Sequence, residues 1–125
     1  MSYSLNTTII KPVSNQNPKS AVILCHGYGG DGKDISILAN YWKNYLPDTI
    51  FLCPDAPEKC EVSDSGFQWF DLMTQNKDQI LTKSFVAEIK LNKFIDEVKE
   101  NYKLNASNIN LAGFSQGCMI ALQTG

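Results

Sequence analysis

The sequence is poor in histidine and has no cysteine pattern typical of a metal site. His26 is its single histidine, and the four cysteines, Cys25, Cys53, Cys60 and Cys118, show no Cys-x-x-Cys spacing. A metal centre built from cysteine and histidine ligands is therefore not expected. We expect reduced thiols, with Cys25 and Cys53 packed in the core as small apolar residues.

The sequence also lacks a strong excess of one charge. It has 11 Lys and Arg against 13 Asp and Glu, for a net charge of −2, so no basic surface for nucleic acid stands out. The N-terminus has neither the basic start nor the apolar stretch of a secretory signal. No apolar run approaches the roughly 20 residues that a membrane span needs. We expect a cytoplasmic protein without a membrane span.

What is present is enough for one domain. The 125 residues are 43% hydrophobic, which suffices to bury a core. Short apolar segments predict strands at 20–25, 49–53 and 108–112. A short leading strand is expected within 3–13, where Pro12 and the turn residues after it end the strand. Between the first two lies a predicted helix, 35–46, whose apolar residues fall at helical spacing and which Pro47 ends: Ile35, Leu38, Ala39, Trp42 and Leu46.

A long helix is predicted over 78–102. Its apolar stripe, expected to pack on the sheet, comprises Phe85, Ile89, Phe94, Ile95, Val98 and Tyr102. Strands alternating with helices predict an α/β fold with a mostly parallel sheet and a ligand site beyond the carboxyl ends of the strands. The connection 54–77 is long and irregular, which is typical of functional loops.

A Gly-x-Ser-x-Gly motif, Gly113 to Gly117, lies between the last predicted strand and an apolar segment that suits a helix. In that setting the motif predicts a nucleophile elbow, with the hydroxyl of Ser115 held above the sheet on a strained turn. The backbone N–H of Gln116, at the start of the following helix, would be a donor to a developing oxyanion. The alternative is an ordinary Gly-Ser turn that opens a helix.

The glycine-rich stretch after the first strand, 25–33, fits more than one template. Gly27, Gly29 and Gly32 satisfy the Gly-x-Gly-x-x-Gly pattern of a dinucleotide-binding loop, and Asp55 falls where a ribose-binding acid is expected. A phosphate-binding P-loop is disfavoured because Asp34 stands where a serine or threonine should hold magnesium. The dinucleotide-binding protein remains an alternative function.

The same stretch is also suited to an oxyanion loop, which would explain the elbow as well. Here the backbone N–H of Tyr28 would be the second donor to a tetrahedral intermediate, beside that of Gln116. We favour this interpretation, because a dinucleotide site leaves Ser115 unexplained. His26 is then expected to be a partly buried residue that orients the loop, not a general base.

From 20 to 125 the sequence resembles the phospholipase/carboxylesterase family of α/β-hydrolases, which includes the acyl-protein thioesterases. The resemblance rests on four segments in the family's order: His26-Gly-Tyr-Gly29, Pro54-Asp-Ala-Pro57, Gln68-Trp-Phe-Asp71 and Gly113-Phe-Ser-Gln-Gly-Cys-Met119. It implies that Ser115 is the nucleophile and that the Tyr28 and Gln116 amides form the oxyanion hole, supported by His26, Gly27, Gly113 and Gly117. It implies hydrolysis of carboxylic esters or thioesters through an acyl-serine intermediate, without a metal or cofactor.

By the same resemblance Trp69 and Phe70 lie near the active-site cleft, although the residues alone equally suit anchors that bury aromatic area. Asp71 is interpreted as a cap or turn residue. In this fold the catalytic acid and then the base follow the serine in chain order, and none follows Gly125. We therefore expect residues 1–125 to be the N-terminal portion of one hydrolase domain: a fragment, one half of a split gene with a separately encoded C-terminal half, or a noncatalytic remnant of a decayed gene.

Overall fold

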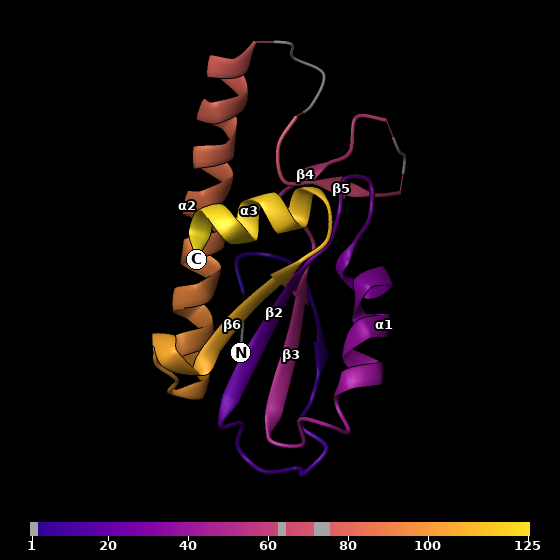
Figure 1. Ribbon diagram of the computed structural model, residues 1–125, viewed down its shortest axis with the longest axis vertical. Helices are drawn as coiled ribbons and strands as arrows, with labels where there is room; N and C mark the ends of the chain where they lie inside the picture. Colours follow the sequence, from indigo (N-terminus) through magenta and orange to yellow (C-terminus); the bar gives the residue numbers. More distant parts are fainter. Residues whose placement is uncertain (1–2, 63–64, 72–75) are drawn as a thin grey trace.

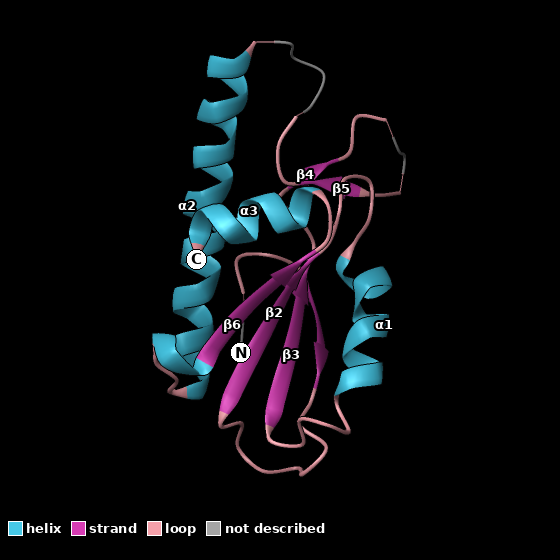
Figure 2. Cartoon of the chain, in the orientation of Figure 1, coloured by secondary structure: helices cyan, strands magenta, loops and turns pink. Residues whose placement is uncertain are grey.

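A four-stranded sheet with the order β1-β3-β2-β6 forms the centre of the protein (Figure 2). The computed structural model describes residues 3–62, 65–71 and 76–125. Strands β3, β2 and β6 run parallel, while β1 pairs with β3 in the antiparallel direction. The strands are β1 (Thr7–Ile10), β2 (Ser20–Cys25), β3 (Thr49–Pro54) and β6 (Ile109–Gly113), and a separate two-stranded ribbon joins β4 (Glu58–Lys59) to β5 (Phe67–Gln68). The predicted mostly parallel α/β sheet and its short leading strand are confirmed.

Helices cover both faces of the sheet. Helix α1 (Gly32–Trp42) lies on one face, and α2 (Lys77–Tyr102) and α3 (Gln116–Thr124) lie on the other (Figure 1). A short 3-10 helix, η1 (Ala106–Asn108), precedes β6. Each face has its own apolar core, and the larger one joins β2 and β3 to α2 and α3. Strand β2 contributes to both cores, which explains its continuous apolar sequence.

Helix α1 begins and ends earlier in the chain than the predicted 35–46. It begins at the side chain of Asp31, which accepts a hydrogen bond from the Asp34 N–H at 2.7 Å, and it ends at Trp42 instead of Leu46. Turns follow the helix, and Trp42 and Leu46 are exposed. Only the first half of the predicted apolar face packs on the sheet, because the chain must leave the helix early to enter β3 at Thr49.

The predicted apolar stripe of α2 is partly wrong. Phe94 and Val98 are buried, but Phe85 and Ile89 are 47% and 68% exposed. The buried face is instead formed by Ser84, Ala87, Leu91, Phe94 and Val98. The small side chains at 84 and 87 allow the helix to approach closely, and this turns its larger apolar residues away from the core. The first half of α2 therefore carries apolar side chains on its outer surface.

Two of the cysteines pack as expected. Cys25 and Cys53 are buried and free, and burial raises the pKa of each thiol to about 12. They are therefore neutral, and they fill the core as small apolar side chains. In the described ranges no helix has both the length and the apolarity to cross a bilayer.

Candidate active site

A strained turn at the carboxyl end of β6 places Ser115 at the start of α3. We call residues 113–117 the elbow turn. Ser115 has φ 56° and ψ −119°, a backbone conformation with positive φ that residues other than glycine rarely adopt. The turn is held by two hydrogen bonds, from the Phe114 N–H to the Cys25 carbonyl at 3.1 Å and from the Gly117 N–H to the Phe114 carbonyl at 2.9 Å. Ser115 itself is exposed.

The two glycines of the motif are required by close backbone approach. A Cβ atom on Gly113 would lie 2.3 Å from the Gly117 carbonyl oxygen, and one on Gly117 would lie 2.0 Å from the Cys25 carbonyl oxygen. Both distances are far below van der Waals contact. The pattern Gly-x-Ser-x-Gly is therefore a steric requirement of how β6, β2 and α3 meet at this turn.

The side chain of Gln116 joins the elbow turn to a neighbouring segment. It is only 2% exposed, its Oε1 accepts from the Trp69 N–H, and its Nε2 donates to the Phe70 carbonyl, both at 2.9 Å. The backbone N–H of Gln116 lies in the first turn of α3, where helix geometry leaves donors without an intrahelical acceptor. The sequence predicted a role only for the backbone N–H of Gln116, and the contacts of its side chain were missed because no motif spacing signals them.

His26 holds the loop that follows β2. Its Nε2 accepts from the Ala56 N–H at 2.9 Å, and its Nδ1 lies 2.7 Å from the Gly27 carbonyl, which fixes a neutral ring with the proton on Nδ1. Burial lowers the pKa of His26 below its usual range, although the contact with Gly27 and nearby acids oppose that shift. With both nitrogens engaged by backbone, this ring is not placed to accept a proton from Ser115.

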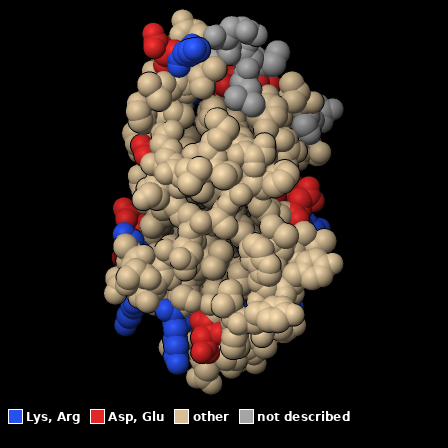
Figure 3. Space-filling view, in the orientation of Figure 1, with Lys and Arg blue, Asp and Glu red and all other residues tan. Residues whose placement is uncertain are grey.

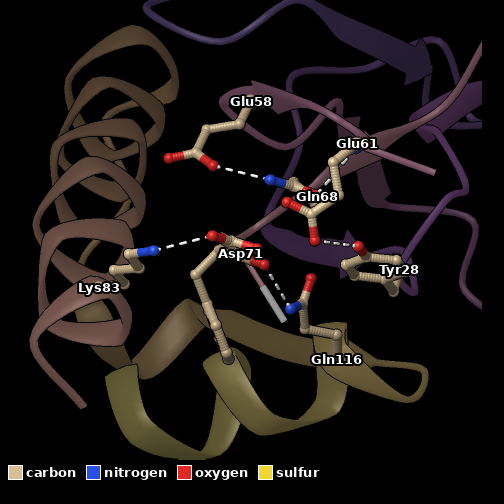
Figure 4. Close-up of polar contacts among 8 residues, drawn as sticks. Tyr28, Glu58, Glu61, Gln68, Asp71, Lys83 and Gln116 are labelled. Atoms are coloured by element: carbon tan, nitrogen blue, oxygen red, sulfur yellow. Dashed lines mark hydrogen bonds and ion pairs between the residues drawn. The ribbon is translucent and has the colours of Figure 1, made fainter. Parts of the chain in front are cut away.

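A hydrogen-bond network fixes the outer side of the same loop (Figure 4). The Tyr28 hydroxyl donates to the Glu61 carboxylate at 2.5 Å, and this bond raises the pKa of the phenol. Gln68 links the ribbon, since its Nε2 donates to Glu58 at 3.0 Å and its Oε1 accepts from the Glu61 N–H at 3.2 Å. The Tyr28 side chain therefore points towards the ribbon.

Residues 67–71, which we call the aromatic segment, lock the two loops together. The Trp69 indole donates to the His26 carbonyl at 2.9 Å, and Phe67 exchanges backbone hydrogen bonds with Gly29 and Gly30, each at 2.9 Å. Trp69 and Phe70 are 1% and 2% exposed, so both side chains are anchors. Asp71 forms a 2.8 Å ion pair with Lys83 of α2 (Figure 4), a structural contact consistent with the expected non-catalytic role.

Asp55 has a structural partner instead of a free carboxylate. Its Oδ1 accepts from the Gly32 N–H at the start of α1 at 2.8 Å, and its Oδ2 accepts from Asn6 at 3.1 Å. A Cβ on Gly32 would lie 2.0 Å from the Cys53 carbonyl oxygen, so this glycine is required for packing of α1 on β3. Asp55 is thus held by the start of α1 and by Asn6, which favours a structural role over the ribose-binding role of the dinucleotide alternative.

A cleft of about 310 Å³ opens beside the elbow turn. Its walls come from the 26–30 loop, the first half of α1 and the Phe114 side chain. A Cβ built on Gly27 would lie 3.4 Å from the Ser115 Cβ, so the loop that forms one wall passes close to the serine. Within the part of the chain that the structure describes, no group of three His, Cys, Asp or Glu residues is arranged to hold a metal ion.

The parallel sheet, its helices and the sharp strand-to-helix turn define an α/β-hydrolase fold, and structural comparison supports this class. Esterase PE8 is 36% identical and superposes with a TM-score of 0.89 over 97% of this chain and 57% of its own. A Bacillus cereus carboxylesterase is 23% identical, with a TM-score of 0.70 over 96% of this chain and 52% of its own.

The chain belongs to the phospholipase/carboxylesterase family, whose family model matches residues 6–125. Among curated relatives, acyl-protein thioesterase 1 of Schizosaccharomyces pombe is 28% identical over all of this chain and 56% of its own length. The chain thus spans about half the length of the relatives that it matches. The predicted family and fold are confirmed.

Proposed function

We propose that this chain supplies the nucleophile and the oxyanion hole of a serine hydrolase acting on carboxylic esters or thioesters. The observation that carries the proposal is Ser115, exposed at φ 56° on a turn between a parallel strand and a helix. A serine is strained in this conformation, and such strain is concentrated at functional sites. Membership of a family of hydrolases supports the same chemistry.

The reaction would proceed through an acyl-serine. The Ser115 Oγ attacks the substrate carbonyl carbon, and its proton passes to a general base. The tetrahedral intermediate then collapses, breaking the bond to the alcohol or thiol, which leaves with that proton. Water attacks the acyl-serine in the second half-reaction, releases the carboxylic acid and restores the Ser115 hydroxyl.

The backbone amides of Tyr28 and Gln116 are the proposed donors to the oxyanion. Each is held by contacts that do not involve substrate: the Tyr28 hydroxyl by Glu61, and the Gln116 side chain by Trp69 and Phe70. Four residues support these donors. His26 holds its loop through the Ala56 N–H, and close backbone approach between the loops is allowed by Gly27, Gly113 and Gly117. Donors fixed before the reaction stabilise developing charge without reorganisation, and loss of one typically costs about 10²- to 10³-fold in rate.

The general base and the acid that orients it must come from elsewhere, because the single histidine is engaged by backbone partners. We propose that they are carried by a further polypeptide segment that pairs with the free edge of β6, whether in the same protein or separately encoded. Strand β6 pairs only with β2 among the described strands. The expected cytoplasmic location stays a prediction, as does the alternative of a noncatalytic remnant.

Covalent labelling tests the assignment. In any form of the protein that carries the base, a fluorophosphonate should modify Ser115, and mass spectrometry should locate the adduct on the peptide that contains it. Ser115→Ala should abolish the adduct, whereas Ser107→Ala, at an exposed serine in η1, should not change it. An adduct on another residue, or labelling that survives Ser115→Ala, would overturn the proposal.

A further inference from the structure

The segment 27–30 has only one side chain by which it can be held. Its other three residues are glycine, so Tyr28 alone has a side chain that can reach a partner. Glycine leaves a backbone free to adopt many conformations, and Gly29 has φ 84°. The proposed oxyanion donor, the Tyr28 N–H, therefore belongs to a segment whose shape must be imposed by contacts with its surroundings.

The peptide group that contains the Tyr28 N–H is anchored at its carbonyl oxygen. This oxygen is that of Gly27, which accepts from the Gly30 N–H at 3.1 Å and lies 2.7 Å from the His26 Nδ1. A peptide group is planar and trans, so its N–H points away from its carbonyl. Among the described residues no acceptor competes with a ligand for the Tyr28 N–H.

The other end of this peptide group, at the Cα of Tyr28, is held in two ways. The following N–H, that of Gly29, donates to the Phe67 carbonyl at 2.9 Å. The Tyr28 side chain extends to Glu61, whose carboxylate accepts from the hydroxyl at 2.5 Å (Figure 4). A hydrogen bond to an ionised acceptor is stronger than one between neutral groups. Holding the carbonyl and the Cα together fixes the plane of the peptide group, and with it the direction of the N–H.

Glu61 is placed by the two-stranded ribbon, which it follows directly after β4. Its N–H donates to the Gln68 Oε1 at 3.2 Å, and Gln68 of β5 is only 4% exposed. The ribbon also lies against the glycine-rich segment, since a Cβ on Gly66 would be 2.0 Å from the Gly29 carbonyl oxygen. The ribbon therefore sets where the Glu61 carboxylate meets the Tyr28 hydroxyl.

We propose that Glu61 is a positioning residue of the oxyanion hole: its carboxylate holds the Tyr28 hydroxyl, and this bond keeps the Gly27–Tyr28 peptide group oriented for its N–H to bind an oxyanion. The proposal rests on the proposed hydrolase function. It gives a role to the tyrosine side chain, which a backbone donor does not itself require. Because water can compete for this exposed bond, its loss should cost well below the roughly 10²- to 10³-fold that removal of a donor costs.

Amide hydrogen exchange, measured by NMR on the 125-residue chain, tests the structural link without any reaction. Tyr28→Phe should speed exchange of the Gly30 N–H, which is bonded to the Gly27 carbonyl, by about threefold to tenfold. The amides of β2 should keep their rates, because the hydroxyl bond lies outside the core. Tyr45→Phe is the matched loss of a hydroxyl, at an 83% exposed position, and should leave both sets of amides unchanged.

The rate at which a fluorophosphonate labels Ser115, in a form of the protein that carries the base, tests the role in the reaction. Tyr28→Phe and Glu61→Ala should each slow labelling by about threefold to tenfold. The double variant should be no slower than either single one, because both substitutions remove the same bond. With p-nitrophenyl butyrate as substrate, the change should fall on kcat and leave KM within about twofold.

Two further variants separate the hydrogen bond from the charge. Glu61→Gln keeps a neutral acceptor and should recover most of the labelling rate lost in Glu61→Ala. Glu100→Ala removes an exposed carboxylate from α2 and should leave the rate unchanged. A Glu61→Gln protein as slow as Glu61→Ala would show that the hydrogen bond to Tyr28 is not what matters.

In a protein whose Ser115 is labelled, an unchanged rate in Tyr28→Phe, or losses that multiply in the double variant, would overturn the proposal. So would unchanged exchange of the Gly30 N–H in Tyr28→Phe. If Ser115 takes no fluorophosphonate in the unsubstituted protein, the hydrolase function itself is overturned, and with it the role of Glu61 in that reaction, even where Gly30 exchange still responds to Tyr28→Phe.

Discussion

The two sides of strand β6 differ in how completely their backbone and side chains are paired and packed. On the β2 side, the elbow turn, the 26–30 loop and the aromatic segment are joined by hydrogen bonds among buried groups, including His26, Trp69 and Gln116. On the other side β6 has no partner strand among the described residues, and Ile109 and Leu111 are only partly buried. The loops around Ser115 are therefore fixed by local contacts, while the sheet that carries them has an edge without a partner strand among the described residues.

The open side extends beyond the strand. Leu122 of α3 is 78% exposed, and a groove of about 450 Å³ runs between α2, β6 and the last turn of α3. Figure 3 shows that this face of the molecule, over α3 and β6, is largely free of charged side chains, which gather at its margins. An unpaired strand edge beside an exposed apolar side chain such as Leu122 is prone to association with other chains.

The largest effect is expected at Gly117, which allows α3 to approach the carboxyl end of β2. Gly117→Ala should destabilise the fold by about 4 kcal/mol or more, because its Cβ would lie 2.0 Å from the Cys25 carbonyl oxygen, which is fixed backbone. Chemical denaturation measures the change. Gly125→Ala, where the nearest atom to the new Cβ is 3.1 Å away at the chain end, is the control and should cost far less. A Gly117→Ala protein of wild-type stability would show that the elbow turn is not as tight as described.

Removal of the buried Gln116 side-chain amide should destabilise the β2 side of β6 by a smaller amount. Gln116→Leu leaves the Trp69 N–H and the Phe70 carbonyl without their partner, which should cost about 2–3 kcal/mol of unfolding free energy. Gln123→Leu, on an exposed position of the same helix, should change stability by no more than about 0.5 kcal/mol. Equal effects of the two substitutions would remove Gln116 from its structural role.

Acid should lower the unfolding free energy through protonation of His26, which also lies on the β2 side of β6. Its pKa is lowered on folding, so the unfolded chain binds more protons as pH falls through the ordinary value of about 6.5. The unfolding free energy should therefore rise with pH below about 7, with a slope from this group of less than about 1.4 kcal/mol per pH unit. Denaturation between pH 5 and 7.5 measures it, and His26→Gln should flatten the slope. An unchanged slope in that variant would contradict the assignment.

The smallest effect on stability, and a clear one on association, is expected on the open side. Leu122→Lys should change the unfolding free energy by no more than about 0.5 kcal/mol while shifting the chain towards monomer in analytical ultracentrifugation. Tyr45→Lys, at an 83% exposed position after α1, should leave association unchanged. If both variants associate alike, the face over α3 and β6 is not the surface through which the chains associate.

The same contrast explains what could be predicted from the sequence. Strand β2 and the elbow turn were predictable because a continuous apolar run and a glycine pattern each have one dominant structural solution. The buried face of α2 was not, since Phe85 and Ile89 continue the helical spacing of the core residues, and only the approach of the neighbouring elements decides which face is covered. The contact between Gln116 and the aromatic segment was not predictable either. Gln116 and Trp69 are 47 residues apart in the chain, and no local sequence pattern signals their hydrogen bond.

The central claim is that this chain holds a nucleophile and its oxyanion donors but no base. The measurement that tests it most directly is the rate at which the purified 125-residue chain hydrolyses a p-nitrophenyl ester, compared with its Ser115→Ala variant. We predict equal rates, because the only histidine is neutral and both of its ring nitrogens are engaged by backbone groups. Turnover that depends on Ser115 in a monodisperse, cooperatively folded chain would contradict the claim and would require a base within these residues.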